Sequence, residues 1–157
     1  MSETYEEIIA GELTIRRGPD ARHDQICERL HVSLFACVAG SETIRLLPPR
    51  SPVEFSPGNL FRPDLALLTA ATNKPWLAAE VIDSRDHHTD TVLKKAVYED
   101  LRLPRLWMVD PRYNNVELYH ATPYGLALTG ILAWREELRE KLLTGFVLKV
   151  SELFGEA

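Results

Sequence analysis

The stretch WLAAEVID, residues 76–83, decides the fold class of this chain. It is apolar at almost every position, which predicts a strand buried on both faces, as the central strands of mixed sheets are. Glu80 interrupts this pattern because it brings a carboxyl group into a strand otherwise suited to the core. An unpaired buried carboxylate costs several kcal/mol. Glu80 is therefore expected to be paired, protonated or bound to a metal ion.

The segments around this strand have the periodicities of an α/β protein. Apolar residues recur at intervals of three and four over residues 20–39 and 90–101, which predicts two helices, the second with Asp90 as its N-cap. Residues 134–142 are interpreted as a polar helical stretch. Further strands are expected at residues 11–16, 44–47, 53–55, 61–69, 105–110, 116–120, 126–132 and 146–150. The chain is thus predicted to be one α/β domain, residues 1–157, with a mixed sheet.

Composition and charge narrow the classes of function. Hydrophobic residues make up 45% and charged residues 26% of the 157 residues, and these globular values exclude a disordered tail or a collagen-like repeat. The apolar stretches are too short for a membrane span of about 20 residues, and the polar start does not resemble a signal peptide, so a cytoplasmic protein is expected. The net charge of −5 offers no basic excess for phosphate neutralisation. A nucleic-acid function therefore has to rest on the chemistry of a site.

The two cysteines, Cys27 and Cys37, lie on the same predicted helix. Ten residues at about 1.5 Å each place them about 15 Å apart along the helix axis. That distance is too long for a disulfide. The sequence therefore predicts free thiols and neither a disulfide framework nor a thiolate metal site.

Two carboxylates are candidates for a metal site. Asp64 stands at the head of a predicted strand, behind Pro63, and Glu80 lies on the next strand. If these strands are antiparallel neighbours, both carboxylates converge at one end of the sheet. Two hard oxygen donors beside a backbone carbonyl suit Mg²⁺ or Mn²⁺, with positions left for water and phosphate. In the alternative interpretation, Asp64 caps a turn and Glu80 binds an arginine, and both are structural.

A second candidate cluster lies in the loop of residues 83–90. His87 and His88 stand there among aspartates, which would suit Zn²⁺ or Mn²⁺. Adjacent histidines in a loop lack a fixed geometry, however, and a polar surface loop explains the same residues.

Four short motifs occur along the chain in one order and spacing. They are Arg62-Pro63-Asp64, Ala79-Glu80-Val81-Ile82, Asp90-Thr91-Val92-Leu93-Lys94 with Tyr98, and Leu106-Trp107-Met108-Val109-Asp110-Pro111. The ordered set resembles the Uma-two family of restriction endonucleases, a branch of the PD-(D/E)XK nuclease superfamily. The resemblance extends over nearly the whole chain and implies a restriction-endonuclease-like core, a mixed central β-sheet flanked by helices.

The resemblance also implies roles for single residues. Asp64 would be the first acid, Glu80 the second acid, and the carbonyl of Val81 a third ligand of Mg²⁺ or Mn²⁺. The lysine expected two residues after the glutamate is replaced by Ile82, and the family pattern places a lysine on the following helix, here Lys94.

An alternative exists for the lysine and for two further residues. Lys94 would instead form a surface pair with Asp90, worth a few tenths of a kcal/mol. Glu12 matches a Gly-Glu strand of the family and would be an additional acid near the metal, or merely an exposed carboxylate. His23, from an Arg-His pair at the start of the first helix, would contact phosphate or Glu12, or be structural.

The expected function is a metal-dependent endonuclease that hydrolyses phosphodiester bonds of DNA. Mg²⁺ held by Asp64 and Glu80 would activate water and neutralise phosphate charge. Lys94 would add electrostatic stabilisation. Nucleic acid is the expected partner, without a membrane and with a homodimer as one arrangement. The alternative is an inactive nuclease-like fold that serves as a binding or assembly module. The acidic net charge favours that alternative, as do Ala10 and Asp83, where the family commonly has Asp and Ser.

Overall fold

The computed structural model describes residues 3–155, and its centre is a six-stranded mixed sheet. The strand order is β10-β9-β8-β7-β6-β3. The strands are β3 (Ile44–Leu46), β6 (Leu65–Thr69), β7 (Lys74–Val81), β8 (Arg105–Asp110), β9 (Asn115–Thr122) and β10 (Gly125–Ala133). β7 and β8 pair in parallel, and the other neighbours pair antiparallel. The predicted mixed sheet is confirmed.

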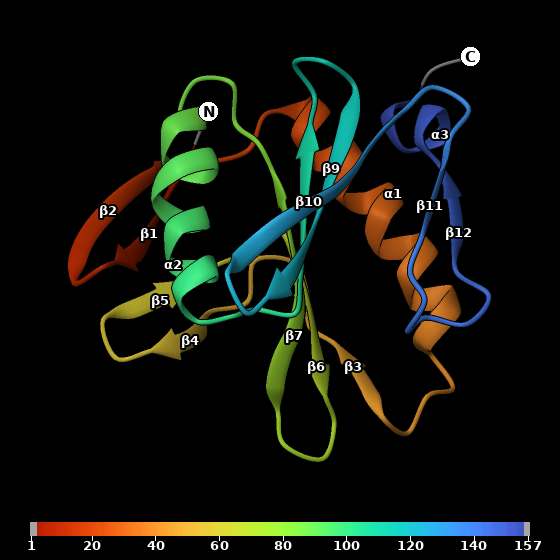
Figure 1. Cartoon of the computed structure of the whole chain (residues 1–157). Helices are drawn as coiled ribbons and strands as arrows, with labels where there is room; N and C mark the ends of the chain where they lie inside the picture. The colour runs from red at the N-terminus through yellow and green to blue at the C-terminus, as the bar shows by residue number, and fades with distance from the viewer. Residues whose placement is uncertain (1–2, 156–157) are drawn as a thin grey trace.

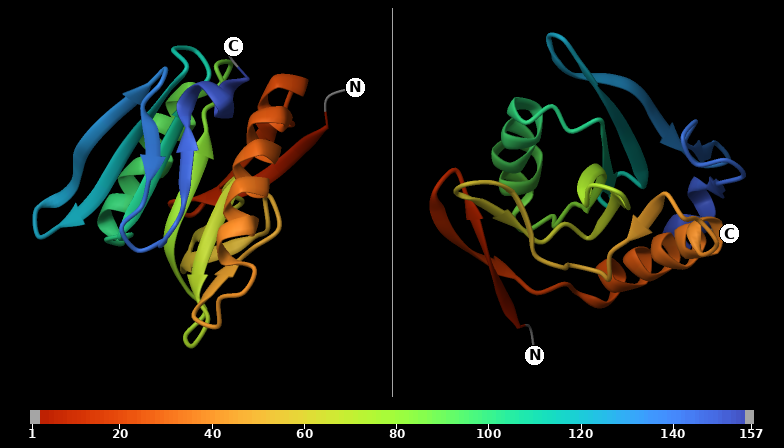
Figure 2. Two further views of the ribbon diagram at one scale, coloured as in Figure 1. Left: turned by 90° about the vertical axis from the view of Figure 1, so that its right-hand side faces the viewer. Right: turned by 90° about the horizontal axis from the view of Figure 1, so that it is seen from below.

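Two smaller sheets and the helices cover this central sheet. The smaller sheets contain β1 (Thr4–Ile9), β2 (Glu12–Arg17), β4 (Val53–Ser56) and β5 (Asn59–Phe61), and β11 (Glu137–Arg139) with β12 (Val147–Lys149). The helices are α1 (Ala21–Val38), the π-helical turn η1 (Thr89–Lys94) that continues into α2 (Lys95–Asp100), and α3 (Val150–Phe154). Figure 1 shows α2 and the four-stranded sheet on one side of the central sheet, with α1, α3 and β11–β12 on the other. Figure 2 shows the same layers from two further directions.

The central strand β7 separates two hydrophobic cores. Leu77, Ala79 and Val81 pack into the core that contains α1, whereas Ala78 packs into the core beneath α2. Side chains alternate between the two faces of a strand. Glu80 therefore lies on the α2 face, and it is only 2% exposed.

Helix α1 begins where the sequence predicts it to begin. The side chain of Asp20 caps it by accepting a hydrogen bond from the backbone N–H of His23 over 2.8 Å. One face of the helix is buried and includes Cys27 and Leu30. Because His23 lies one turn before Cys27, the buried face also carries His23 toward the end of the central sheet. No helix among residues 3–155 is long and apolar enough to cross a membrane.

Several expected elements differ from the structure. Residues 134–142 are not helical: Trp134 has a left-handed φ of 58°, and β11 follows within the segment. The polar spacing there arises from loop contacts, since the side chain of Glu140 accepts a hydrogen bond from Arg105 over 2.6 Å. Asp90 is not an N-cap but lies within η1, where its carboxylate binds other parts of the chain. The strand β1 was not predicted, although it supplies a residue of the candidate site.

Candidate active site

Asp64 is buried at the head of β6 and is held by three groups. Its Oδ2 accepts a hydrogen bond from the Val81 N–H over 2.7 Å, and its Oδ1 lies 2.9 Å from His23 Nε2 and 3.2 Å from Arg50 Nε. β6 and β7 are antiparallel, as expected, with Leu65 opposite Ala79. Burial raises the pKa of Asp64, but His23, Arg50 and the Val81 amide outweigh burial and hold it below its usual value.

Glu80 reaches toward the helix on the other side of the sheet. Its Oε2 accepts a hydrogen bond from the Tyr98 hydroxyl over 2.7 Å and lies 2.5 Å from the Lys94 amine. Both of these contacts use Oε2. Burial raises the pKa of Glu80 to about 8; Lys94 opposes this rise, and the nearby carboxylates of Glu7, Asp90 and Asp64 add to it. Burial and the neighbouring carboxylates together therefore outweigh the effect of Lys94 on the pKa of Glu80.

Lys94 is completely buried between the two acids that it contacts. Besides Glu80, its Nζ lies 2.8 Å from Glu7 Oε2, and it stands 5.1 Å from the centre of the Phe61 ring. Burial lowers the pKa of Lys94, but Glu80 and Glu7 outweigh burial, so the amine stays protonated. The alternative of a surface pair with Asp90 is wrong. The neighbouring Lys95 points elsewhere, to 4.3 Å above the Tyr119 ring.

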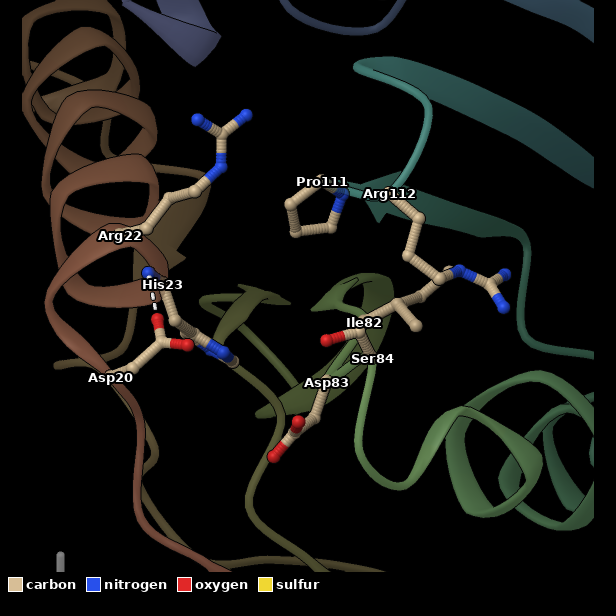
Figure 3. A pocket seen from close by; sticks show the side chains of 8 residues that line it. All are labelled: Asp20, Arg22, His23, Ile82, Asp83, Ser84, Pro111 and Arg112. Carbon is tan, nitrogen blue, oxygen red and sulfur yellow. Dashed lines mark hydrogen bonds between the residues drawn. The ribbon is translucent and has the colours of Figure 1, made fainter.

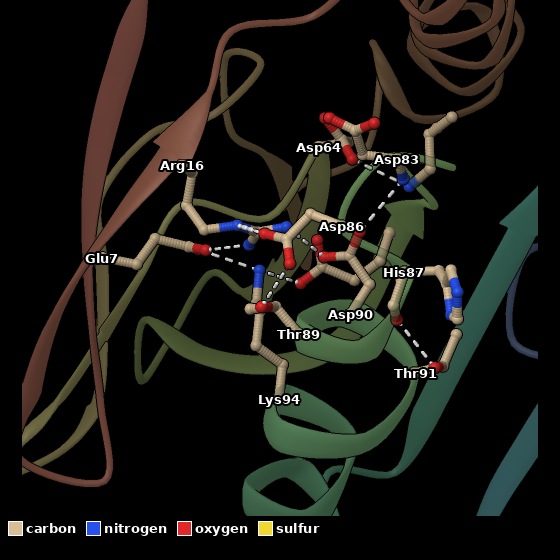
Figure 4. Close-up of polar contacts among 12 residues, drawn as sticks. Glu7, Arg16, Asp64, Asp83, Asp86, His87, Thr89, Asp90, Thr91 and Lys94 are labelled. Atoms are coloured by element: carbon tan, nitrogen blue, oxygen red, sulfur yellow. Dashed lines mark hydrogen bonds and ion pairs between the residues drawn. The ribbon is translucent and has the colours of Figure 1, made fainter.

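A buried arginine links the acids on the far side of Lys94. Arg16, from β2, forms ion pairs with Glu7, with Asp90 Oδ1 at 2.7 Å and with Asp86 Oδ2 at 3.0 Å. Figure 4 shows Arg16 and Lys94 entering the same acidic cluster from different elements. Burial raises the pKa of Asp90 although Arg16 opposes this, while Lys94 keeps the pKa of Glu7 below its ordinary value against burial. The cluster therefore joins the acid and the base of the β1–β2 hairpin to acids and a base within residues 80–94.

Glu7 takes the place that the sequence interpretation gave to Glu12. Glu12 is exposed opposite Ile9 at the end of the β1–β2 hairpin, and in the described structure it contacts neither Asp64 nor Glu80. The expectation that Glu12 is an additional acid beside the other two is wrong. The sequence analysis missed Glu7 because it did not recognise β1. Glu7 and the apolar Ile9 are two residues apart and are both buried on the same side of this strand.

The other predicted residues have mixed outcomes. His23 contacts Asp64 and not Glu12. The backbone of Val81 adjoins Asp64 through its N–H. Ile82, at the position where a lysine was missing, is a buried core residue. His87 and His88 are exposed, as the surface-loop alternative predicts.

A pocket lies beside His23 at this end of the sheet. Figure 3 shows Arg22 of α1 and Arg112, which follows β8, on opposite sides of the pocket. Arg112 is held by two contacts to Asp110 at 2.9 and 3.0 Å, and Arg22 donates to the side chain of Asn114. The lining residues are Asp20, Arg22, His23, Ile82, Asp83, Ser84, Pro111 and Arg112. Two arginines thus line the pocket next to His23, the residue that contacts Asp64.

The fold is that of a nuclease-like α/β protein. The structure is similar to the "Crystal structure of a putative nuclease belonging to DUF820 from Anabaena variabilis ATCC 29413", with a TM-score of 0.79 and 13% sequence identity. The similarity covers 96% of this chain and 89% of that chain, and at this identity it concerns the fold.

A match to a family model classifies the chain more narrowly than the similarity of folds does. The model of the Uma2 family, described as "Putative restriction endonuclease", matches residues 2–151, so the chain belongs to that family. No curated protein matches the chain. The resemblance found from the four motifs is confirmed, and so is the nuclease-like fold that it implies.

Proposed function

We propose that this protein is a metal-dependent endonuclease that hydrolyses phosphodiester bonds of DNA. Asp64, Glu80 and the carbonyl of Val81 would hold Mg²⁺ or Mn²⁺, and Lys94 would act on the phosphate. One observation carries the proposal: the completely buried amine of Lys94 lies 2.5 Å from Glu80, while Asp64 binds the amide that directly follows Glu80. The proposal is supported by two acids at the ends of neighbouring strands and by a lysine that contacts one of them, in a chain that belongs to a family described as restriction endonucleases.

The donor atoms fit a hard divalent cation. Carboxylate and carbonyl oxygens are the ligands that Mg²⁺ and Mn²⁺ prefer. The contacts of Glu80 to Tyr98 and Lys94 both use Oε2, so Oε1 would be the oxygen offered to the metal. The raised pKa of Glu80, caused by burial and by its acidic neighbours, supports the proposal, since an ionised carboxylate at this position would need further positive charge. A bound cation would satisfy that need.

The protein groups around the acids have separable tasks. A bound Mg²⁺ would lower the pKa of a coordinated water and neutralise charge on the scissile phosphate. Lys94, whose amine Glu80 and Glu7 keep protonated by raising its pKa, would stabilise the negative charge that develops on the scissile phosphate. The Tyr98 hydroxyl fixes the orientation of Glu80 by its hydrogen bond. His23 and Arg50 do the same for Asp64.

The pocket beside His23 supports an anionic substrate. Arg22 and Arg112 face it from two sides, and arginine suits bidentate contact with phosphate oxygens. A chain with net charge −5 has no general attraction for DNA. We therefore place the phosphates next to the scissile one at these two arginines.

A binding or assembly module is the second candidate function. It is favoured by the closed polar network, in which Arg50 already pairs with Asp64, and Lys94 with Glu7. Ala10 and Asp83, which depart from the family pattern, point in the same direction. In such a protein the same contacts would only stabilise the fold.

Cleavage of a supercoiled plasmid separates the two functions. We expect nicking with Mg²⁺ or Mn²⁺, and loss of nicking in Asp64→Asn, which removes one metal-binding charge but keeps the side-chain shape. Asp100→Asn, at the exposed end of α2, is the matched control and should cleave like the wild type. Equal activity of Asp64→Asn would place the chemistry elsewhere. A wild type that cleaves neither DNA nor RNA with any divalent metal would favour the module.

A further inference from the structure

Three side chains that are typical zinc ligands, those of His23, Cys27 and Asp64, lie together between α1 and the head of β6. His23 and Cys27 are four residues apart and therefore lie one turn apart on the same side of α1. Asp64 approaches them from the head of β6. One ligand atom from each of the three residues lies within 4.8 Å of the other two, and His23 Nε2 is 2.9 Å from Asp64 Oδ1. The sequence analysis looked for a thiolate site with several cysteines, and this cluster contains only one cysteine, Cys27.

The donor set is chemically different from the proposed magnesium site. One imidazole nitrogen, one thiolate and one carboxylate oxygen are typical ligands of Zn²⁺, whereas Mg²⁺ takes oxygen ligands. Metal–ligand bonds of about 2.0–2.3 Å in a tetrahedron separate the ligand atoms by about 3.3–3.6 Å. Side-chain movements on the order of 1 Å would bring the three atoms to that spacing. Three protein ligands leave the fourth position for water, toward the pocket that His23 lines.

The geometry points to a Zn²⁺ site formed by His23, Cys27 and Asp64, which competes with the nuclease metal for Asp64. The inhibitory part rests on the proposed function, but the binding part does not. When Zn²⁺ binds, the Cys27 thiol and the ligating ring nitrogen of His23 release their protons to solvent, and the sulfur and the nitrogen each form a bond to the metal. The bond to Asp64 replaces its contact with His23. Asp64 is then no longer available to hold Mg²⁺ beside Glu80, and cleavage stops.

The charges around the three ligands are compatible with a bound Zn²⁺ ion. Two anionic ligands, the thiolate and the carboxylate, balance the two charges of Zn²⁺. Arg50, whose Nε lies 3.2 Å from Asp64 Oδ1, therefore faces a neutral complex. Arg50 also keeps a second carboxylate partner, Asp24, at 3.0 Å. The buried position of Cys27 and Asp64 excludes competing water from the metal–ligand bonds.

Binding is tested with Co²⁺, a spectroscopic substitute for Zn²⁺, added to the full chain. Thiolate bound to Co²⁺ gives an intense near-ultraviolet charge-transfer band, and Zn²⁺ should abolish it by displacement. The chain has only two cysteines, so any band in Cys37→Ser must come from Cys27. We expect the band to persist in Cys37→Ser and to disappear in Cys27→Ser, with Zn²⁺ affinity at least tenfold weaker in the latter. Absence of the band in wild type or in Cys37→Ser overturns the site, whether or not Cys27→Ser folds.

Inhibition is tested by titrating Zn²⁺ into plasmid cleavage at fixed Mn²⁺, in Cys37→Ser and in Cys27→Ser. The ratio of cleavage with and without Zn²⁺ should fall at least tenfold in Cys37→Ser and stay near one in Cys27→Ser. Equal inhibition of both proteins would overturn the regulatory role. If no protein cleaves at all, the proposed function fails, whereas the Co²⁺ band still decides the metal site. The two failures are therefore distinguishable.

Discussion

The carboxylate of Asp64 accepts the N–H of Val81, the residue directly after Glu80, over 2.7 Å. This bond fixes the first acid to the strand that carries the second. It depends on the antiparallel register of β6 and β7, with Leu65 opposite Ala79. A shift of one residue would turn Glu80 to the other face of the sheet. The two acids therefore form one unit that the strand pairing holds in place, and the following predictions test this unit and its partners.

Lys94 is predicted to be needed for cleavage, while Lys95 is not. Lys94→Ala removes a positive charge placed beside Glu80 and should reduce the cleavage rate by a factor on the order of 10²–10³. Lys95→Ala is the control, because Lys95 lies above Tyr119 on another side of the helix. Single-turnover cleavage of a labelled duplex measures both. A similar loss in the two variants would mean general phosphate attraction and contradict a placed catalytic amine.

Arg16 is predicted to stabilise the fold by pairing two buried acids. Arg16→Met leaves Glu7 and Asp90 without this partner, and breaking a buried pair costs about 3–5 kcal/mol of the free energy of unfolding. Urea denaturation followed by circular dichroism measures the loss. The control is Arg139→Met, which removes an exposed pair with Glu137 and should cost less than about 1 kcal/mol. Equal costs would show that the cluster contributes nothing beyond a surface pair.

The affinity for Mg²⁺ is predicted to rise with pH up to about pH 8. Burial raises the pKa of Glu80 to about 8, so below that pH the metal-free protein holds a proton that Mg²⁺ must displace. For one displaced proton the affinity should increase about tenfold per pH unit and level off above the pKa. Titration calorimetry at several pH values measures this slope. Glu80→Gln should bind more weakly and lack the slope; a slope that persists in this variant would assign the proton to another group.

Arg22 is predicted to contact DNA phosphate from the side of the pocket. Arg22→Ala should weaken DNA binding and reduce the slope of the logarithm of affinity against the logarithm of salt concentration by about one. Fluorescence anisotropy in Ca²⁺, over a salt series, measures the binding without cleavage. Arg139→Ala, on the distant strand β11, should leave the slope unchanged. An unchanged slope in Arg22→Ala would mean that Arg22, and the pocket that it lines, does not contact the DNA backbone.

The sequence by itself determined the elements whose signals are local. The apolar run around Glu80 predicted a central strand, and the spacing of apolar residues after Asp20 predicted α1, because these patterns follow from the strand and helix periods. The ordered motifs predicted the family and the nuclease-like fold. The segment 134–142 was predicted wrongly as a helix, because one of its polar side chains, Glu140, binds the distant Arg105 while the others make local contacts in a loop and in β11.

Only the tertiary structure decided which charges meet. Lys94 contacts Glu7 across 87 positions of the sequence, and Arg16 contacts Asp90 across 74. The helix and strand periodicities of the sequence do not predict such pairs, because the pairs depend on how β1 and β2 pack against η1. For the same reason the hairpin's buried acid is Glu7 and not Glu12, and Cys27 lies beside Asp64. Local sequence patterns indicate which side chains point toward the core. The partner that each buried charge requires is determined by the packing of segments distant in the sequence.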